Sequence, residues 1–371
     1  MKKIIHIITG LNVGGAEMSL YKFTRSDDDT KQLVISLSGG NTLLPKFQNK
    51  QIEVHVFNFK SPIKSFIALY LFIKKQNPDI IQGWMYHGNV VAYLVSKASK
   101  KNIVIWNIRH SLYSISHEKF VTRQVIKIGK FISNKIDFIV YNSAVSKALH
   151  EGYGFSNKKS CVIYNGFAMQ NTLYKNRCRK KSREIFGIDD DLIIIGHIGR
   201  FHAMKDHELF IKMSLKLLEK SSNIGFMMVG ANINYQNPTL RELIPEKYYK
   251  NFWLIGESSN ISSVMCVFDI FCQSSWSEAF PNVVGEAMAM EIPCIATDVG
   301  DTKLLIGDER YIVPKRNLDE LYDAMYSMVF KKKIIRDEIG KNLKMRIEKN
   351  FPEDAVKKNY MLLYQQLLND E

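Results

Sequence analysis

Two glutamates eight residues apart, Glu278 and Glu286, lie in a segment that suits ligand binding. The segment follows an apolar run at 269–272, and Pro281 favours a helix that begins near it, because proline fits the first helical turn, where its missing N–H would have no partner. The start of such a helix presents unpaired backbone N–H groups and a positive dipole end to a ligand. Two acids at one spacing also recur by chance, so a helix-entry acid and a surface acid are the alternative interpretation.

Two cations, Arg200 and Lys205, follow the strand predicted at 192–198. A diphosphate needs cations of this kind, because the charge that builds on a departing phosphate must be neutralised in the transition state. Taken alone, these residues suit an ordinary solvated basic loop slightly better than a phosphate site.

Gly14 and Gly15 follow the first predicted strand, at 3–8. Paired glycines let the backbone approach a phosphate or a sugar closely and open the next helix. The segment lacks the full spacing of the dinucleotide-binding glycine motif, so a plain tight turn explains it equally well.

His87 and His110 each come after a predicted strand of the first half, on the side that would face a ligand. Lone histidines are more often packing or surface residues, and neither of these two has metal-ligand spacing. The five cysteines are scattered, odd in number and without a C-x-x-C pair, which argues against a disulfide framework or a zinc site.

Apolar runs alternate with helical patterns along the chain, which implies parallel strands joined by crossover helices. The first series of predicted strands comprises 3–8, 33–37, 54–57, 80–81, 103–106 and 138–141. The second series comprises 192–198, 225–229, 252–255, 270–272, 294–297 and 310–313. The sequence therefore predicts an α/β fold of two doubly wound, Rossmann-like domains facing a central cleft, where the carboxyl ends of the strands would meet a ligand.

This pattern divides the chain into four parts. We predict an N-terminal domain at 1–172, a basic linker at 173–190, a C-terminal domain at 191–350 and a final helix within 351–371. Apolar residues recur at helical spacing in the final segment, so we expect that helix to bury one face.

Length and composition also indicate two globular domains, since a chain of 371 residues, 46% of them hydrophobic, is too long for a single ordinary hydrophobic core. The longest apolar stretches, such as 63–73, fall short of the roughly 20 residues of a membrane span, so we expect no integral anchor. The N-terminal segment is basic and then apolar but lacks a small-residue cleavage site. It predicts a buried first strand and a cytoplasmic protein.

The net charge of +14 is unevenly distributed. Residues 1–172 carry +14 and residues 173–183 carry +6, whereas residues 184–371 carry −6. A basic half beside an acidic half indicates that the first half meets something anionic: a phospholipid surface, a pyrophosphate-linked acceptor or nucleic acid.

Taken together, the motifs resemble the family 4 glycosyltransferases of the GT-B fold. The matching segments occur in family order over nearly the whole chain: 14–17, 162–166, 199–205, 229–230, 254–256, 278–286 and 297–300. The resemblance implies a nucleotide-sugar site mainly in the C-terminal domain, an acceptor site in the N-terminal domain, and a last helix that crosses back onto the N-terminal domain. It further implies retention of anomeric configuration, no cofactor and no metal requirement.

Residue roles follow from the same resemblance. Arg200 and Lys205 would hold the donor diphosphate, with Gly15 beneath it. Glu278 would contact the transferred sugar and Glu286 the ribose hydroxyls. The remaining donor positions would be Gly14, Gly230, Phe280, Pro281, Asn282 and Val283. Catalysis would fall to Glu278, His110, Lys205 and Arg200, with His87, Arg109 and Asn165 on the acceptor side.

A helix predicted at 119–135 gives the basic half a possible role. Its cations Lys119, Arg123, Lys127 and Lys130 would lie along one face, opposite Val121, Val125, Ile128 and Ile132. The helix is either an ordinary surface helix or an attachment to an anionic membrane. The second interpretation predicts peripheral binding to the inner face of the plasma membrane and a lipid-linked glycan acceptor.

The sequence thus predicts a hexosyl- or N-acetylhexosaminyltransferase of bacterial surface-polysaccharide assembly, such as O-antigen or capsule, with a UDP-sugar favoured over GDP-mannose. Two alternatives remain open. A nucleotide-sugar 2-epimerase would share the two-domain architecture, and a nucleic-acid-binding protein would explain the charge. No recognised RNA or DNA motif accompanies that charge, so we expect no nucleic-acid partner.

Overall fold

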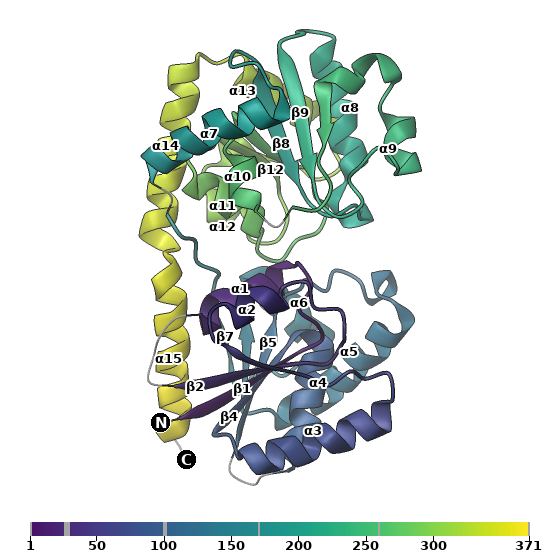
Figure 1. The fold of residues 1–371 in the computed structure, drawn as a ribbon, viewed down its shortest axis with the longest axis vertical. Coiled ribbons are helices and arrows are strands. Elements are labelled where there is room, and N and C mark those ends of the chain that lie inside the picture. Colours follow the sequence, from purple (N-terminus) through teal and green to yellow (C-terminus); the bar gives the residue numbers. More distant parts are fainter. Residues whose placement is uncertain (1, 26–29, 99–101, 170, 259, 370–371) are drawn as a thin grey trace. The chain divides into compact units, whose positions relative to one another are not determined.

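The computed structural model describes residues 2–25, 30–98, 102–169, 171–258 and 260–369 (Figure 1). The chain forms two compact units. Unit 1 comprises residues 1–165 together with 354–371, and unit 2 comprises residues 166–353.

Unit 1 contains a seven-stranded parallel sheet with the strand order β3-β2-β1-β4-β5-β6-β7. The strands are β1 (Lys3–Ile8), β2 (Lys31–Ser36), β3 (Glu53–Val56), β4 (Ile80–Trp84), β5 (Ile103–Ile108), β6 (Phe138–Tyr141) and β7 (Ser160–Val162). The winding direction reverses at β1, because the chain passes from β3, at one edge of the sheet, to β4, on the other side of β1. This order is the doubly wound arrangement that the alternating pattern predicts.

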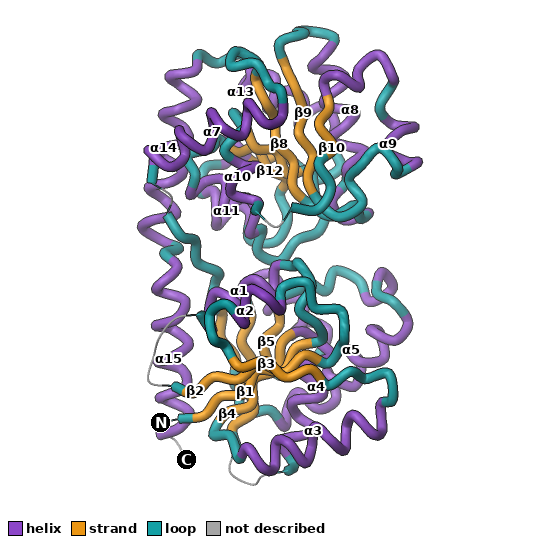
Figure 2. Tube along the Cα trace, viewed as in Figure 1, coloured by secondary structure: helices purple, strands orange, loops and turns teal. Residues whose placement is uncertain are grey.

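Helices cover both faces of this sheet (Figure 2). One face carries α3 (Pro62–Gln76), α4 (Met85–Ser96), α5 (Phe120–Ile132) and α6 (Ala144–Tyr153), and the other carries α1 (Gly15–Thr24), α2 (Leu44–Gln48) and α15 (Glu353–Asn369). Because both faces are covered, the strands are apolar almost throughout, as in β1 with its five consecutive buried residues.

The helix α15 belongs to unit 1 although it lies at the other end of the sequence. Tyr360, Leu363 and Tyr364 are buried in the same apolar cluster as strand residues of β1, β4 and β5. The side chain of Asn107 donates a hydrogen bond of 2.6 Å to the Tyr360 hydroxyl, and the Tyr364 hydroxyl donates one to Gln82. The core of unit 1 is therefore completed by the last helix.

Unit 2 contains a six-stranded parallel sheet with the strand order β10-β9-β8-β11-β12-β13. The strands are β8 (Ile193–Ile198), β9 (Ile224–Val229), β10 (Phe252–Leu254), β11 (Ile270–Gln273), β12 (Cys294–Thr297) and β13 (Ile312–Val313). The longer helices are α7 (Thr172–Phe186), α8 (His207–Leu218), α11 (Asn282–Ala289), α13 (Leu318–Val329) and α14 (Lys333–Asn350). Both sheets confirm the predicted α/β class.

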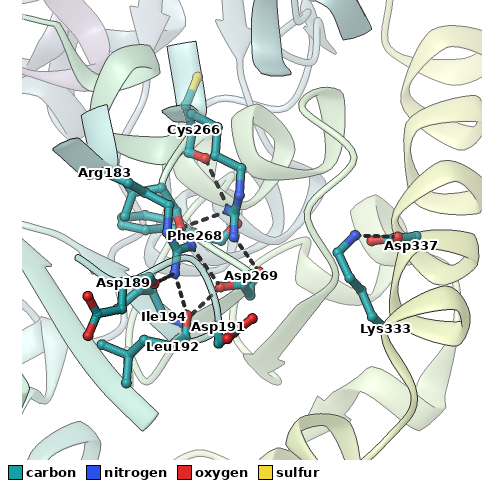
Figure 3. Close-up of polar contacts among 12 residues, drawn as sticks. Arg183, Asp189, Asp191, Leu192, Ile194, Cys266, Phe268, Asp269, Lys333 and Asp337 are labelled. Carbon is teal, nitrogen blue, oxygen red and sulfur yellow. Dashed lines mark hydrogen bonds and ion pairs between the residues drawn. The ribbon is translucent and has the colours of Figure 1, made fainter. Parts of the chain in front are cut away.

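The prediction of a linker at 173–190 is wrong over most of that range, because residues up to Phe186 belong to the helix α7. Two of its cations bind Asp269 within unit 2. Arg179 donates to this carboxylate at 2.7 Å. Arg183 lies 3.4 Å from it (Figure 3). Arg183 also donates to the carbonyl oxygens of Asp189 and Leu192. These two arginines donate hydrogen bonds to backbone carbonyl oxygens of unit 2 and do not mark a flexible connection.

The helix α5 also differs from its prediction. Its buried residues are Ile126, Gly129 and Ile132, whereas Val121 and Ile128, predicted on one face together with Ile132, are exposed. Within the described parts of the chain, no helix combines the length and the hydropathy that crossing a bilayer requires.

Candidate active site

The carboxyl ends of β8 and β11, which are neighbours in the unit 2 sheet, bring two predicted residues together. The Lys205 ammonium lies 2.5 Å from Glu278 Oε1. Both side chains are largely buried, at 23% and 15% exposure. The hydroxyl of Ser275 donates a second hydrogen bond, of 2.7 Å, to the same carboxylate oxygen. The partly buried setting strengthens this pair relative to a surface ion pair, because water screens it less.

Backbone contacts fix the loops after β8 and β9. Gly230 has a φ of +151°, and a Cβ there would lie 2.2 Å from the carbonyl oxygen of Gly199. Only glycine allows this approach and this conformation. Arg200 follows Gly199 directly and is exposed, so its guanidinium group is available to a ligand at the same edge of the sheet.

The segment around Pro281 begins α11, with Pro281 as the residue that precedes the helix. The side chain of Phe280 is buried and stacks on Phe167, with ring centroids 6.1 Å apart. Gly285 makes room for Phe167, because a Cβ would lie 2.1 Å from its ring. The Phe280 side chain is therefore a core anchor, and only the backbone of this residue is suited to the predicted ligand contact.

The other residues of this segment lie on or beside the first turn of the helix. Asn282 and Val283 are half-buried, and Glu286 is half-buried one turn further on. The turn before the helix is fixed by Gly300, whose φ is +54° and whose Cβ would lie 2.2 Å from the Ala279 carbonyl oxygen. The amide of Asp301 donates to that same oxygen at 2.9 Å.

Unit 1 brings together a second set of predicted residues. Arg109, directly after β5, donates to Ser19 of α1 at 2.8 Å and to the side-chain oxygen of Asn165. Its guanidinium lies over the Trp84 ring at 5.4 Å, and burial lowers its pKa from the usual value. Arg109 thus links α1 to the loop that follows β7.

Gly14 immediately precedes α1, and Gly15 is the first residue of that helix. Gly14 has an extended backbone with a φ of −164°, and the atoms nearest to a Cβ there belong to the end of the flexible Glu17 side chain, so the structure does not require glycine at this position. The Ser19 hydroxyl donates to the carbonyl oxygen of Gly15 at 2.8 Å.

The two candidate histidines differ in their surroundings. His110 Nε2 lies 2.8 Å from Glu118 Oε1, and its carbonyl oxygen accepts a 2.6 Å hydrogen bond from the Ser146 hydroxyl. His87 is half-buried in the first turn of α4, where burial lowers its pKa. A carboxylate partner fixes the orientation of an imidazole, so His110 is the better placed of the two for acid–base work.

Sequence reasoning missed three polar partners of the site: Ser19, Glu118 and Ser275. None stands at a motif spacing, although Ser275 precedes Glu278 by three residues. Among the described residues, no group of three or more histidine, cysteine or carboxylate side chains could hold a metal ion.

Two family models match the chain. Residues 193–329 match the model described as "Glycosyl transferases group 1", and residues 13–170 match "Glycosyltransferase Family 4". The chain is a family 4 glycosyltransferase. Every predicted site residue falls within one of the two matched ranges.

Curated relatives and solved structures agree with this assignment. The chain is 23% identical to the capsular polysaccharide biosynthesis glycosyltransferase CapM of Staphylococcus aureus, over 100% of this chain and 98% of the relative. It is also 23% identical to the putative glycosyltransferase EpsF of Bacillus subtilis, over 80% and 79% of the two chains. The structure of Anabaena Alr3699/HepE in complex with UDP-glucose superposes with a TM-score of 0.85 at 18% identity, covering 100% of each chain. These neighbours confirm the predicted GT-B fold.

Proposed function

We propose that this glycosyltransferase transfers a hexose or an N-acetylhexosamine, with retention of anomeric configuration, from a UDP-sugar to a lipid-linked glycan of capsule or O-antigen synthesis. GDP-mannose is the second candidate donor. The observation that carries the proposal is the contact between Lys205 and Glu278 at the carboxyl edge of the unit 2 sheet. The UDP-glucose complex of the Anabaena neighbour and the capsule role in the name of the CapM relative support the donor and the pathway.

Hydrogen-bonding capacity suits the two residues to a shared ligand. A lysine ammonium has three donors, so Lys205 can contact a phosphate oxygen while it holds Glu278. A carboxylate has about four acceptor sites, so Glu278 can accept from sugar hydroxyls while Lys205 and Ser275 fix its position. Arg200 adds a second cation for the diphosphate, and Glu286 would accept from the ribose hydroxyls.

Charge stabilisation by these cations accounts for the reaction without a metal ion. Breaking the bond between the anomeric carbon and the phosphate leaves negative charge on the departing nucleotide, and fixed cations stabilise that charge in the transition state. On the acceptor side we assign Arg109 and Asn165 to positioning, whereas Gly14 and Gly15 remain donor positions, as the family resemblance implies. His110, held by Glu118, would accept the proton of the attacking hydroxyl group, and His87 is the alternative.

Alanine variants of the ion pair test the proposal. We expect K205A and E278A to lower kcat by about 100- to 1,000-fold, because each loses a group that acts on the transition state. The matched control is K212A, whose lysine also lies 2.6 Å from a glutamate, Glu208, but on an exposed helix face. Nucleotide release from a panel of UDP- and GDP-sugars is the readout. Wild-type rates in K205A and E278A would refute the proposed chemistry.

Two further measurements separate the alternatives. NMR of the product anomer tests retention, and an inverted product would refute it. Incubation of the donor without acceptor tests the epimerase alternative, which requires an epimerised nucleotide-sugar and no transfer.

The outer surface of unit 1 supports a membrane-borne acceptor and peripheral binding at the cytoplasmic face. On α3, Ile63, Ile67 and Leu71 are exposed at a spacing of four residues, with 78% exposure at Ile63. On α5, Phe120 and Phe131 are exposed at 66% and 77%. Lysines flank both sets, and residues 54–78 contain no acidic residue. Apolar side chains between cations suit an anionic lipid surface.

A further inference from the structure

Beneath the loop after β8, a buried serine and a buried histidine hold the backbone of Lys205. We propose that Ser274 and His197 are positioning residues that fix the Lys205 backbone and thereby the place of its ammonium group. The inference rests on the proposed role of Lys205 in donor binding and turnover. Neither residue belongs to a motif that the sequence analysis used.

The Ser274 hydroxyl shares its single hydrogen between two consecutive carbonyl groups. It lies 2.9 Å from the oxygen of Lys205 and 3.0 Å from that of Asp206. Asp206 has a φ of +49°, in the left-handed region, which allows both carbonyls to turn toward one donor. Ser274 is completely buried, so these bonds are shielded from competing water.

His197 supports the serine from the strand below. Its Nε2 lies 3.2 Å from the Ser274 hydroxyl oxygen. The hydroxyl hydrogen is used by the two carbonyls, so the serine oxygen must accept here and His197 must carry its hydrogen on Nε2. Its Nδ1 is buried and has no partner in the described part of the chain, which agrees with an unprotonated nitrogen.

The charge state of His197 suits this role. Burial, together with the neighbouring His207 and Lys205, holds the pKa of His197 well below its usual value. A neutral ring can donate one hydrogen bond without adding a positive charge beneath the cations of the site. His207 supports the other end of the loop in the same way, with Nε2 3.3 Å from the carbonyl oxygen of Gly199.

Ser275, the next residue, completes the arrangement. Ser274 and Ser275 directly follow β11, and their hydroxyl groups have different partners. Ser274 binds the backbone of Lys205, whereas Ser275 binds the carboxylate of Glu278. One dipeptide at the end of β11 therefore positions both members of the ion pair.

A pair of serine variants tests the proposal. S274A removes the hydroxyl beneath Lys205, and S214A removes an equally buried hydroxyl that donates to the Phe210 carbonyl within α8, at 2.8 Å. We expect S274A to lower kcat per folded molecule by about 10- to 100-fold, because a small displacement of a catalytic group costs a large factor in rate. S214A should stay within about two-fold of wild type, since it changes no contact of the loop.

Variants of His197 add a rescue experiment. H197Q keeps an N–H donor near the Ser274 oxygen, whereas H197L removes it. We expect H197Q to retain more kcat than H197L, and we expect H197L and S274A to be non-additive, because both act through one hydrogen-bonded chain. Thermal unfolding and circular dichroism of each variant give the folded fraction by which kcat is divided.

The outcomes distinguish this inference from the proposed function. If K205A keeps its rate, the role of Lys205 fails. If K205A is inactive but S274A loses no more kcat per folded molecule than S214A, the positioning role of Ser274 is overturned. Equal loss of kcat in H197Q and H197L would overturn the role of His197. If the loss of activity in S274A merely follows its loss of folded protein, the residue is structural and the inference is wrong.

Discussion

At the scale of single residues, the buried imidazole groups set how unit 1 responds to acid. His150 Nδ1 lies 2.7 Å from the carbonyl oxygen of Ser146, and its Nε2 lies 2.8 Å from the Tyr86 hydroxyl. The carbonyl oxygen can only accept, so Nδ1 carries a hydrogen, and in the neutral ring Nε2 accepts from Tyr86. Burial lowers the pKa of His150 to about 4.

This shift predicts that acid weakens unit 1. The unfolded chain binds a proton at His150 below a pH of about 6.5, whereas the folded chain binds it only near pH 4, so stability falls as the pH drops through this window. H150Q removes the titrating group but can still accept from Tyr86. We expect its unfolding free energy to fall less than that of wild type between pH 6.5 and pH 4 in urea titrations. The unfolding free energy at pH 8 serves as the baseline for each protein. Parallel pH profiles of the two proteins would contradict the prediction.

At the scale of elements, α3 and α5 show that helical periodicity does not reveal which apolar face is buried. The α5 prediction placed Ile128 and Ile132 together on the face opposite the cations, yet Ile132 is buried and Ile128 is 48% exposed. A pattern with apolar residues on most sides of a helix is satisfied by several rotations about its axis. Packing of Ile126 and Gly129 on the sheet selects one of them and leaves Phe131 outside.

The exposed faces of these helices predict how the protein binds liposomes. We expect more protein to float with liposomes that contain anionic lipid than with neutral ones, because lysines add attraction to the anionic surface. The variants I63S/I67S/L71S on α3 and F120S/F131S on α5 should each reduce recovery several-fold, since they remove apolar area that enters the bilayer interface. The control is I334S on α14, which removes an isoleucine that is 74% exposed on unit 2. Equal recovery from neutral and anionic liposomes would count against membrane attachment.

At the scale of the whole molecule, the chain completes the core of unit 1 with its last segment. Leu363 is buried against the unit 1 sheet at 8% exposure, whereas its neighbour Leu362 is 52% exposed. The last helix is therefore a structural part of the unit that contains the N-terminus.

A matched pair of leucine variants tests this dependence. L363A should destabilise unit 1 by about 2–5 kcal/mol, the usual cost of a leucine truncation in a core. L362A should change its stability by less than about 0.5 kcal/mol. Hydrogen exchange of amides in β1 and β4 reports the stability of unit 1 separately from that of unit 2. Similar exchange rates in the two variants would show that α15 does not stabilise this core.

The sequence by itself determined the α/β class, most strands and the order of the motifs, because apolar runs and their spacing are local properties. It also indicated Glu278 and Lys205 as separate candidates. Their contact was a tertiary result, since 73 residues separate them and only the pairing of β8 with β11 places their loops together.

Tertiary structure alone decided the roles of three other features. Phe280 lies in a donor motif, yet its side chain packs on Phe167 because apolar aromatic area is driven into the core. The basic stretch at 173–183 suggested a linker, but carbonyls and Asp269 provide partners for its arginines. Ser274 and His197 carry no motif, and their hydrogen bonds to the Lys205 loop depend on the fold. A hydrogen-bond partner distant in sequence leaves no local signal, so these positions required the structure.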